Sequence, residues 1–229
     1  MREKIAIGFD IDGTLIKTPE YHILAYGKVI EEMFGIKLSV KDIFRHLGKT
    51  SEGIIKDILK EYNVDYEEED IKNCVEKIDK LAIKLIFEKG VELYPSVKKV
   101  IERLKNSGFL MGVVTGNKKE VAEAKLKAAG LYEFFDKDLI VSSEISHDRS
   151  VLVKEFKERA MKKGCSHIFI VGDTSNDILA GKANDVFTIG IPTEFYNKNE
   201  LEMCSPNCVI TDFKYLEKAI VECLGGKNE

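Results

Sequence analysis

Two short apolar runs, each followed at once by a pair of aspartates, constrain this sequence more than any other feature. The runs and the acids that follow them are residues 5–9 with Asp10 and Asp12, and residues 168–171 with Asp173 and Asp177. Continuous apolar runs of this length are typical of strands that are buried on both faces of a parallel sheet. Ligands of such sheets bind at the carboxyl ends of the strands, so we expect the four carboxylates to meet in one cleft.

Carboxylates that share a small cleft repel one another. At about 4 Å and an effective dielectric constant near 20, each pair of like charges costs about 4 kcal/mol. Proteins offset such repulsion with a divalent cation or with a shared proton. The pattern therefore predicts a site for a hard metal ion, with a reactive carboxylate beside it.

The sequence from Gly90 onward alternates between strand-like and helix-like segments. The predicted strands cover residues 110–114, 139–141, 168–171, 186–191 and 208–210, and the predicted helices cover residues 95–108, 118–129, 150–163, 176–183 and 213–224. Such alternation predicts an α/β fold, with a doubly wound parallel sheet of the Rossmann-like type.

A long helical segment interrupts this alternation just after the first predicted strand. Apolar residues recur at helical spacing in three stretches of residues 16–89. We expect these residues to form an all-helical cap, inserted into a catalytic core made of residues 1–15 and 90–229. An insertion at this point would hang over the carboxyl end of the first strand and act as a lid.

Composition narrows the class of partner. The formal net charge is −4 and the pI is about 5.8, without a basic stripe that would favour nucleic acid. No segment approaches the roughly 20 apolar residues of a membrane span. The five cysteines form no Cys-x-x-Cys pair, which is typical of reduced thiols and favours a cytoplasmic location. The oligomeric state stays open.

Three motifs in a fixed order carry the chemistry. They are Asp10-Ile11-Asp12-Gly13-Thr14-Leu15, Thr115-Gly116-Asn117, and Gly172-Asp173-Thr174-Ser175-Asn176-Asp177. Each of them alone could be a structural turn or a helix cap. Together, and with a helical insertion behind the first, they resemble the haloacid-dehalogenase-like (HAD) superfamily. The insertion resembles that of the helical-cap subgroup, which includes phosphoglycolate-phosphatase-like and phosphoglucomutase-like proteins.

The resemblance implies roles for the four aspartates. Asp10 would be the nucleophile that forms an aspartyl-phosphate. Asp12 would protonate the leaving alkoxide and then deprotonate the hydrolytic water. The cofactor would be Mg²⁺, held by the carboxylates of Asp10 and Asp173 and by the backbone carbonyl of Asp12. Asp177 would support the metal shell or its waters.

The resemblance also implies a set of phosphate-binding groups. Thr115, with backbone N–H groups near Gly116 and Asn117, would donate hydrogen bonds to the phosphoryl oxygens at a helix start. The family usually places a lysine before the helix that follows the fourth strand, and here that stretch contains Arg149. We expect Arg149 to bridge the nucleophile and the phosphoryl group as a bidentate fork, with Lys154 as the alternative.

A linker inside the cap is the candidate for substrate recognition. Similar linkers in helical-cap relatives face the active site, so Arg45 or Lys49 would meet an anionic group of the substrate. A plain helix connection, with Thr50 or Ser51 as N-cap, accounts for the same residues equally well. His147 could approach the cleft from the core, but the sequence shows no acidic partner that would orient it.

These expectations point to Mg²⁺-dependent hydrolysis of a small phosphomonoester, with phosphoglycolate as one candidate by resemblance. The cap would exclude bulk water and protein-sized substrates. A phosphomutase of the β-phosphoglucomutase type is the main alternative, because it would share Asp10 and Asp12. A haloacid dehalogenase fits less well, since Asp12 and the metal set serve phosphoryl transfer. A response-regulator-like switch would lack the cap, and a binding module would have lost one of the aspartates.

Overall fold

Six parallel strands form the sheet at the centre of the protein. The structure is a computed structural model, and it describes residues 4–17, 20–46, 49–193 and 196–225. The strands are β1 (Ile5–Phe9), β2 (Leu110–Val114), β3 (Ile140–Val141), β4 (His167–Gly172), β5 (Phe187–Gly190) and β6 (Cys208–Val209). Their order is β3-β2-β1-β4-β5-β6. This is the Rossmann order, which confirms the predicted α/β fold and places a crevice where the order reverses, beside β1.

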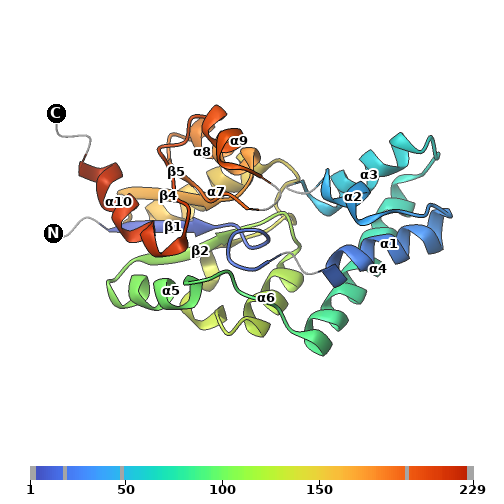
Figure 1. The fold of residues 1–229 in the computed structure, drawn as a ribbon, viewed down its shortest axis with the longest axis horizontal. Helices are drawn as coiled ribbons and strands as arrows, with labels where there is room; N and C mark the ends of the chain where they lie inside the picture. The colour runs from blue at the N-terminus through green and yellow to red at the C-terminus, as the bar shows by residue number, and fades with distance from the viewer. Residues whose placement is uncertain (1–3, 18–19, 47–48, 194–195, 226–229) are drawn as a thin grey trace.

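Helices cover both faces of this sheet (Figure 1). One face packs against α5 (Val97–Asn106), α6 (Lys119–Ala128) and α10 (Leu216–Gly225). The other face packs against α7 (Arg149–Lys162) and α8 (Ser175–Ala183). Successive residues of a strand point to opposite faces of the sheet, and both faces are buried here, so β1 is apolar throughout. Ile7 and Phe9 pack on the face covered by α5, α6 and α10, and Ala6 packs on the face covered by α7 and α8.

The predicted elements of the core agree with the structure to within a few residues, with three differences. The strand predicted over residues 139–141 begins one residue later in the structure, as β3, because Leu139 belongs to a 3-10 turn, η2 (Lys137–Leu139). The sequence did not predict α9 (Lys198–Met203), which is too short to show a helical repeat of apolar residues. The predicted helix 213–224 begins later, at Leu216, because its first three residues form a 3-10 turn, η3 (Phe213–Tyr215). A further 3-10 turn among the described residues is η1 (Tyr132–Phe134).

Four helices between β1 and α5 form a separate layer at one end of the molecule, on the right in Figure 1. They are α1 (Glu20–Phe34), α2 (Val40–Phe44), α3 (Ser51–Glu61) and α4 (Glu68–Lys89). They bury an apolar core of their own, which includes Tyr26, Ile55 and Ile78. Thr50, one of the two expected N-cap residues, accepts a hydrogen bond from Gly53 N at 3.3 Å. We call this helical layer the cap.

The cap contacts the rest of the protein, here called the core, in two regions. Ile86 of α4 packs against Val121 and Ala124 of α6. Next to this apolar contact, the Lys118 ammonium lies 3.1 Å from the Asp79 carboxylate. In the second region, a Cβ atom placed on Gly116 would lie 2.8 Å from the backbone carbonyl oxygen of Lys49. The cap therefore reaches the loop that follows β2.

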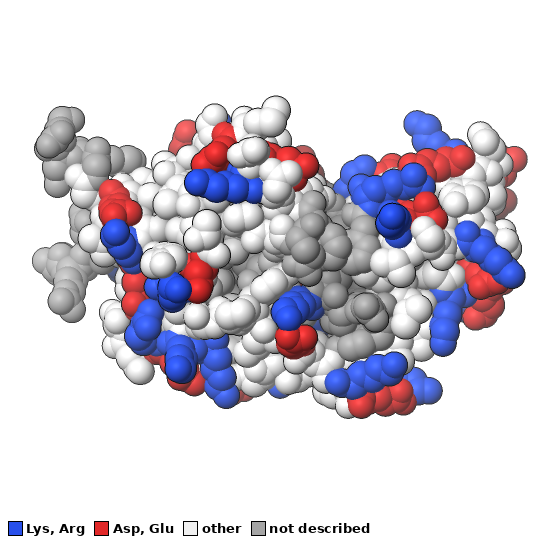
Figure 2. Space-filling model, in the orientation of Figure 1, with Lys and Arg blue, Asp and Glu red and all other residues white. Residues whose placement is uncertain are grey.

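Among the described residues, no helix combines the length and the apolar character needed to cross a membrane. On the face shown in Figure 2, basic and acidic side chains are interspersed rather than gathered by sign. That face offers no basic stripe for a nucleic acid.

Gly112 in β2 allows the apolar side chains between the sheet and α7 to pack closely. A Cβ atom there would lie 2.4 Å from the Leu139 carbonyl oxygen and 2.7 Å from the Phe156 ring. We expect Gly112→Ala to lower the free energy of unfolding by about 1–3 kcal/mol, because the added methyl overpacks this face. The control is Gly27→Ala in α1, where the nearest atom would be 4.0 Å away. Urea unfolding should show the control gaining about 0.5–1 kcal/mol, and an unchanged Gly112→Ala would contradict this packing.

Candidate active site

Asp10 and Asp173 lie side by side at the carboxyl edge of the sheet. The Asp10 N–H donates to the carbonyl of Val171 at 2.9 Å, which extends the pairing of β1 with β4 beyond the end of β1. The two aspartates are only 5% and 4% exposed. Gly13, at φ +88°, makes this approach possible, because a Cβ atom on it would lie 2.1 Å from Asp173 Oδ2. A side chain at Gly13 would therefore push Asp173 away from the first motif.

Arg149 joins the carboxylates of two different motifs. Its Nη2 lies 3.1 Å from Asp10 Oδ1, and its Nε lies 3.3 Å from Asp177 Oδ1. Its Nη1 donates to the carbonyl oxygen of Val114, at the end of β2, at 2.7 Å. Lys154, the alternative cation, lies exposed on α7. The structure thus brings Arg149, and not Lys154, to the expected nucleophile.

Hydroxyl groups fix the other two carboxylates. The Thr14 hydroxyl donates to Asp173 Oδ1 at 3.2 Å. Thr174, the N-cap of α8, donates to Asp177 Oδ2 from its hydroxyl at 2.7 Å and from its backbone N–H at 3.3 Å. Asp177 is therefore part of a capping box at a helix start.

The buried charges perturb one another. Burial raises the pKa of Asp10 to about 7, although the Arg149 guanidinium acts in the opposite direction. Burial, with repulsion from Asp10, raises the pKa of Asp173 well above its usual range. Asp177 and Asp10 raise the pKa of Arg149, against the effect of burial. Three buried carboxylates thus share one guanidinium, so that without a bound cation Asp10 and Asp173 hold their protons to higher pH than ordinary aspartates.

A second polar cluster holds Asp12 and the loop after β2. Asn117 Nδ2 donates to Asp12 Oδ2 at 2.7 Å and to Thr115 Oγ1 at 2.9 Å. The Asn117 backbone N–H also donates to Thr115 Oγ1, at 3.2 Å. The ammonium of Lys125 lies 2.5 Å from Asp12 Oδ2. Sequence reasoning missed Lys125, although it falls on the buried face of α6, beside Ala122 and Leu126.

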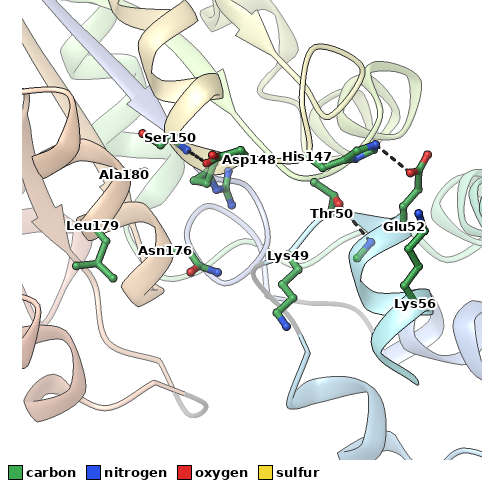
Figure 3. A pocket seen from close by; sticks show the side chains of 12 residues that line it. Lys49, Thr50, Glu52, Lys56, His147, Asp148, Ser150, Asn176, Leu179 and Ala180 are labelled. Carbon is green, nitrogen blue, oxygen red and sulfur yellow. Dashed lines mark hydrogen bonds and ion pairs between the residues drawn. The ribbon is translucent and has the colours of Figure 1, made fainter. Parts of the chain in front are cut away.

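A cavity of about 570 Å³ opens between the cap and the core (Figure 3). Its lining from the cap includes Lys49, Glu52 and Lys56, and its lining from the core includes His147 and Arg149. The His147 imidazole has an acidic partner that the sequence did not reveal, since its Nε2 lies 2.9 Å from Glu52 Oε2. The cavity therefore adjoins the residue that contacts Asp10.

The two expected specificity residues differ in their position. Lys49 lines the cavity, and its ammonium pairs with Asp57 of α3. Arg45 is not among the lining residues; it forms ion pairs with Asp42 at 3.1 Å and with Glu61 at 2.8 Å. The adjoining Leu47 and Gly48 lie outside the described residues.

Comparison with known proteins identifies the family of this arrangement. A family model for haloacid dehalogenase-like hydrolases matches residues 7–191. The chain belongs to this family. Pyrophosphatase PpaX from Halalkalibacterium halodurans is 29% identical over 210 residues, which cover 88% of this chain and 90% of that protein. The expectation of a phosphatase of the HAD superfamily is thereby confirmed.

Solved structures share the fold of this HAD-family chain. A predicted phosphoglycolate phosphatase from Haemophilus somnus 129pt has a TM-score of 0.79 at 23% identity, over 96% of this chain and 99% of that one. CbbY from Rhodobacter sphaeroides, solved in complex with phosphate, has a TM-score of 0.79 at 19% identity, over 93% and 96%. At such identities, the likeness concerns the fold.

The donor set of this HAD-family site fits Mg²⁺. Among the residues that the structure describes, no three carboxylate, imidazole or thiol side chains converge as a ready-made metal cluster. The expected set is different, because it consists of the two carboxylates of Asp10 and Asp173 and the backbone carbonyl of Asp12. All are oxygen donors, and Mg²⁺ completes its shell with water and phosphate oxygens. A divalent cation bound there would offset the repulsion between the buried carboxylates and replace the protons that they otherwise hold.

The position of Arg149 leads to a direct prediction for this phosphatase. We expect Arg149→Ala to lower the turnover rate by about 10²–10³-fold, because it removes preorganised positive charge beside Asp10. Lys154→Ala, on the exposed side of the same helix, serves as control and should leave the rate close to that of the wild type. Steady-state assays of both variants decide the matter, and the reverse order of effects would make Lys154 the bridging cation.

Proposed function

We propose that this chain hydrolyses small phosphomonoesters with the help of Mg²⁺, through an aspartyl-phosphate on Asp10. One observation carries the proposal: Asp10 is buried at the end of β1, with the Arg149 guanidinium on one of its oxygens and the Asp173 carboxylate beside it. This geometry supports the proposal, because a carboxylate beside a fixed positive charge, at the sheet edge where ligands bind, is suited to act as a nucleophile.

In the first step, an Asp10 carboxylate oxygen forms a bond to phosphorus, and the bond from phosphorus to the leaving oxygen breaks. Asp12 gives its proton to that leaving oxygen. When bound by Asp10, Asp173 and the Asp12 carbonyl, Mg²⁺ would neutralise charge on the phosphoryl oxygens.

In the second step, Asp12 takes a proton from water as the water oxygen attacks phosphorus. The bond between phosphorus and Asp10 then breaks, which releases phosphate and restores both aspartates.

Thr115, Gly116, Asn117 and Arg149 would bind the phosphoryl group. Thr115 Oγ1 accepts two hydrogen bonds from Asn117, so its hydroxyl hydrogen can point to a phosphoryl oxygen. Thr115 is fully buried, and Gly116 lies beneath the Lys49 carbonyl. Substrate entry therefore requires this part of the cap to move away from the loop, as expected of a lid.

The cavity beside Arg149 suits a small phosphorylated metabolite. Its volume of about 570 Å³ falls within the range of small-molecule sites. We propose that the Lys49 ammonium leaves Asp57 and pairs with an anionic group of the substrate. Arg45 does not line the cavity, so its proposed role in substrate recognition has no support from the cavity. Phosphoglycolate is a candidate phosphomonoester, and the similarity to pyrophosphatase PpaX adds pyrophosphate, a phosphoanhydride, as a candidate outside that class.

Product analysis with Mg²⁺ tests the proposed function. Phosphoglycolate, pyrophosphate and several hexose phosphates are incubated with the protein, and both inorganic phosphate and isomeric sugar phosphates are measured. We expect phosphate release from at least one compound, and none from the Asp10→Asn variant. Formation of an isomeric sugar phosphate without phosphate release would instead establish the mutase, which uses the same two aspartates.

A further inference from the structure

Lys125 is a fully buried lysine whose charge points into the active site. Its side chain is 0% exposed, whereas the other lysines of α6 are exposed to solvent. Burying an ammonium without a partner is strongly unfavourable. The partners of Lys125 are the Asp12 carboxylate, at 2.5 Å, and the side-chain carbonyl of Asn117, at 3.1 Å. Both belong to motifs assigned here to the reaction.

The contacts of Lys125 fix the orientation of Asn117. Because an ammonium only donates, the amide oxygen of Asn117 must face Lys125. The amide nitrogen then faces Asp12 and Thr115, and it donates to both. Without the lysine, the amide could turn over and lose these two contacts.

The same contacts hold the Asp12 carboxylate. Its Oδ2 receives one donor from α6 and one from the loop after β2, at 2.5 and 2.7 Å. Two donors from separate elements on one oxygen restrict rotation of the carboxylate, and a bond to a charged group is stronger than a neutral one. Proton transfer needs the donor within hydrogen-bond reach of the leaving oxygen, so a fixed orientation favours it.

We infer that Lys125 is a positioning residue for Asp12: it fixes the carboxylate that exchanges a proton with the leaving oxygen. The inference rests on the proposed function, in which Asp12 is the general acid. Lys125 lies in α6, outside the three motifs, so the inference adds this helix to the elements that serve the reaction.

Leaving-group dependence separates this role from a structural one. p-Nitrophenolate departs readily as an anion, whereas the alkoxide of benzyl phosphate needs a proton. We expect Lys125→Met to lower the single-turnover rate of benzyl phosphate by about 10²-fold, and that of p-nitrophenyl phosphate by less than about threefold. Lys127→Met is the matched control, because this lysine of the same helix is 49% exposed and pairs with Glu123. The control should change neither rate.

A double-mutant cycle gives the second readout. In the Asp12→Asn background, adding Lys125→Met should cause no further loss, because the lysine acts through Asp12. Equal losses with both phosphates, or a further loss in that background, would overturn the inference. Should Lys125→Met fail to fold, Lys125→Gln keeps a donor in place and should show the same selective loss in weaker form.

The failure of this inference can be told from the failure of the proposed function. If Asp12→Asn retains the benzyl phosphate rate, then the general-acid role of Asp12 is wrong, and the role of Lys125 is wrong with it. If Asp12→Asn loses that rate and Lys125→Met keeps it, only the inference about Lys125 is overturned.

Discussion

Replacing Asp10 by asparagine is expected to lower turnover by at least about 10⁴-fold, as the loss of a nucleophile does in other covalent enzymes. The amide is nearly the size of the carboxylate, but it cannot attack phosphorus. Steady-state assays with Mg²⁺ measure the loss, and Asp65→Asn, at an exposed position of the cap, is the control for a change of charge alone. A variant that retains its rate would remove Asp10 from the reaction.

The same variant is expected to be more stable than the wild type when no metal is bound. Burial raises the pKa of Asp10 from 3.8 to about 7, so ionising this group in the folded protein costs up to about 4 kcal/mol. Asparagine removes that cost at neutral pH and leaves Arg149 its contact with Asp177. Thermal unfolding in EDTA at pH 8 should show a higher melting temperature for Asp10→Asn than for the wild type. A lower melting temperature would show that the carboxylate stabilises the fold.

Removing Mg²⁺ with EDTA is expected to abolish turnover, and adding the ion back is expected to restore it. Mg²⁺ should also stabilise the fold, by about 2.7 kcal/mol at a concentration 100 times its dissociation constant. Asp173→Asn should lose most of this stabilisation, because it removes one of the two carboxylates proposed to bind the ion. Asp65→Asn should retain it. Activity that persists in EDTA would contradict the proposed use of the metal.

The metal-free protein should also depend on pH in a defined direction. A carboxyl with a raised pKa keeps its proton in the folded state after the unfolded chain has lost it. The free energy of unfolding therefore falls as the pH rises from about 4 to about 7, the interval between the two pKa values of Asp10. Asp173 contributes in the same direction. Mg²⁺ should reduce this decline, and urea unfolding between pH 4 and pH 8, with and without the ion, measures both effects.

Much of the fold follows from the sequence, because parallel strands bury both faces and leave continuous apolar runs. The runs before Asp10 and Asp173 predict two buried strands of a parallel sheet, and the structure pairs them as neighbours, β1 and β4. The two carboxylates meet because the carboxyl ends of parallel strands share one edge and these two strands are adjacent. Arg149 stands in the stretch where the family usually places a lysine, and the structure places its guanidinium on Asp10.

Other parts of the site depend on contacts between segments that no local pattern reveals. Lys125 resembles the surface lysines of the same helix, and the packing of α6 shows that it is buried. Glu52 and His147 meet because α3 lies against the loop before α7, a contact between cap and core. The position of Lys125 on an apolar face was the one available signal, since a charge there requires a buried partner.

Covalent capture of the phosphoryl group tests the central proposal most directly. The protein is mixed with Mg²⁺ and a turned-over substrate, quenched in acid within the first turnover and digested for mass spectrometry. We expect a phosphoryl group on the peptide that contains Asp10, absent from Asp10→Asn and increased in Asp12→Asn if hydrolysis of the intermediate slows more than its formation. A phosphoryl group on another residue, or first-turnover phosphate release without any phosphorylated peptide, would contradict the role of Asp10.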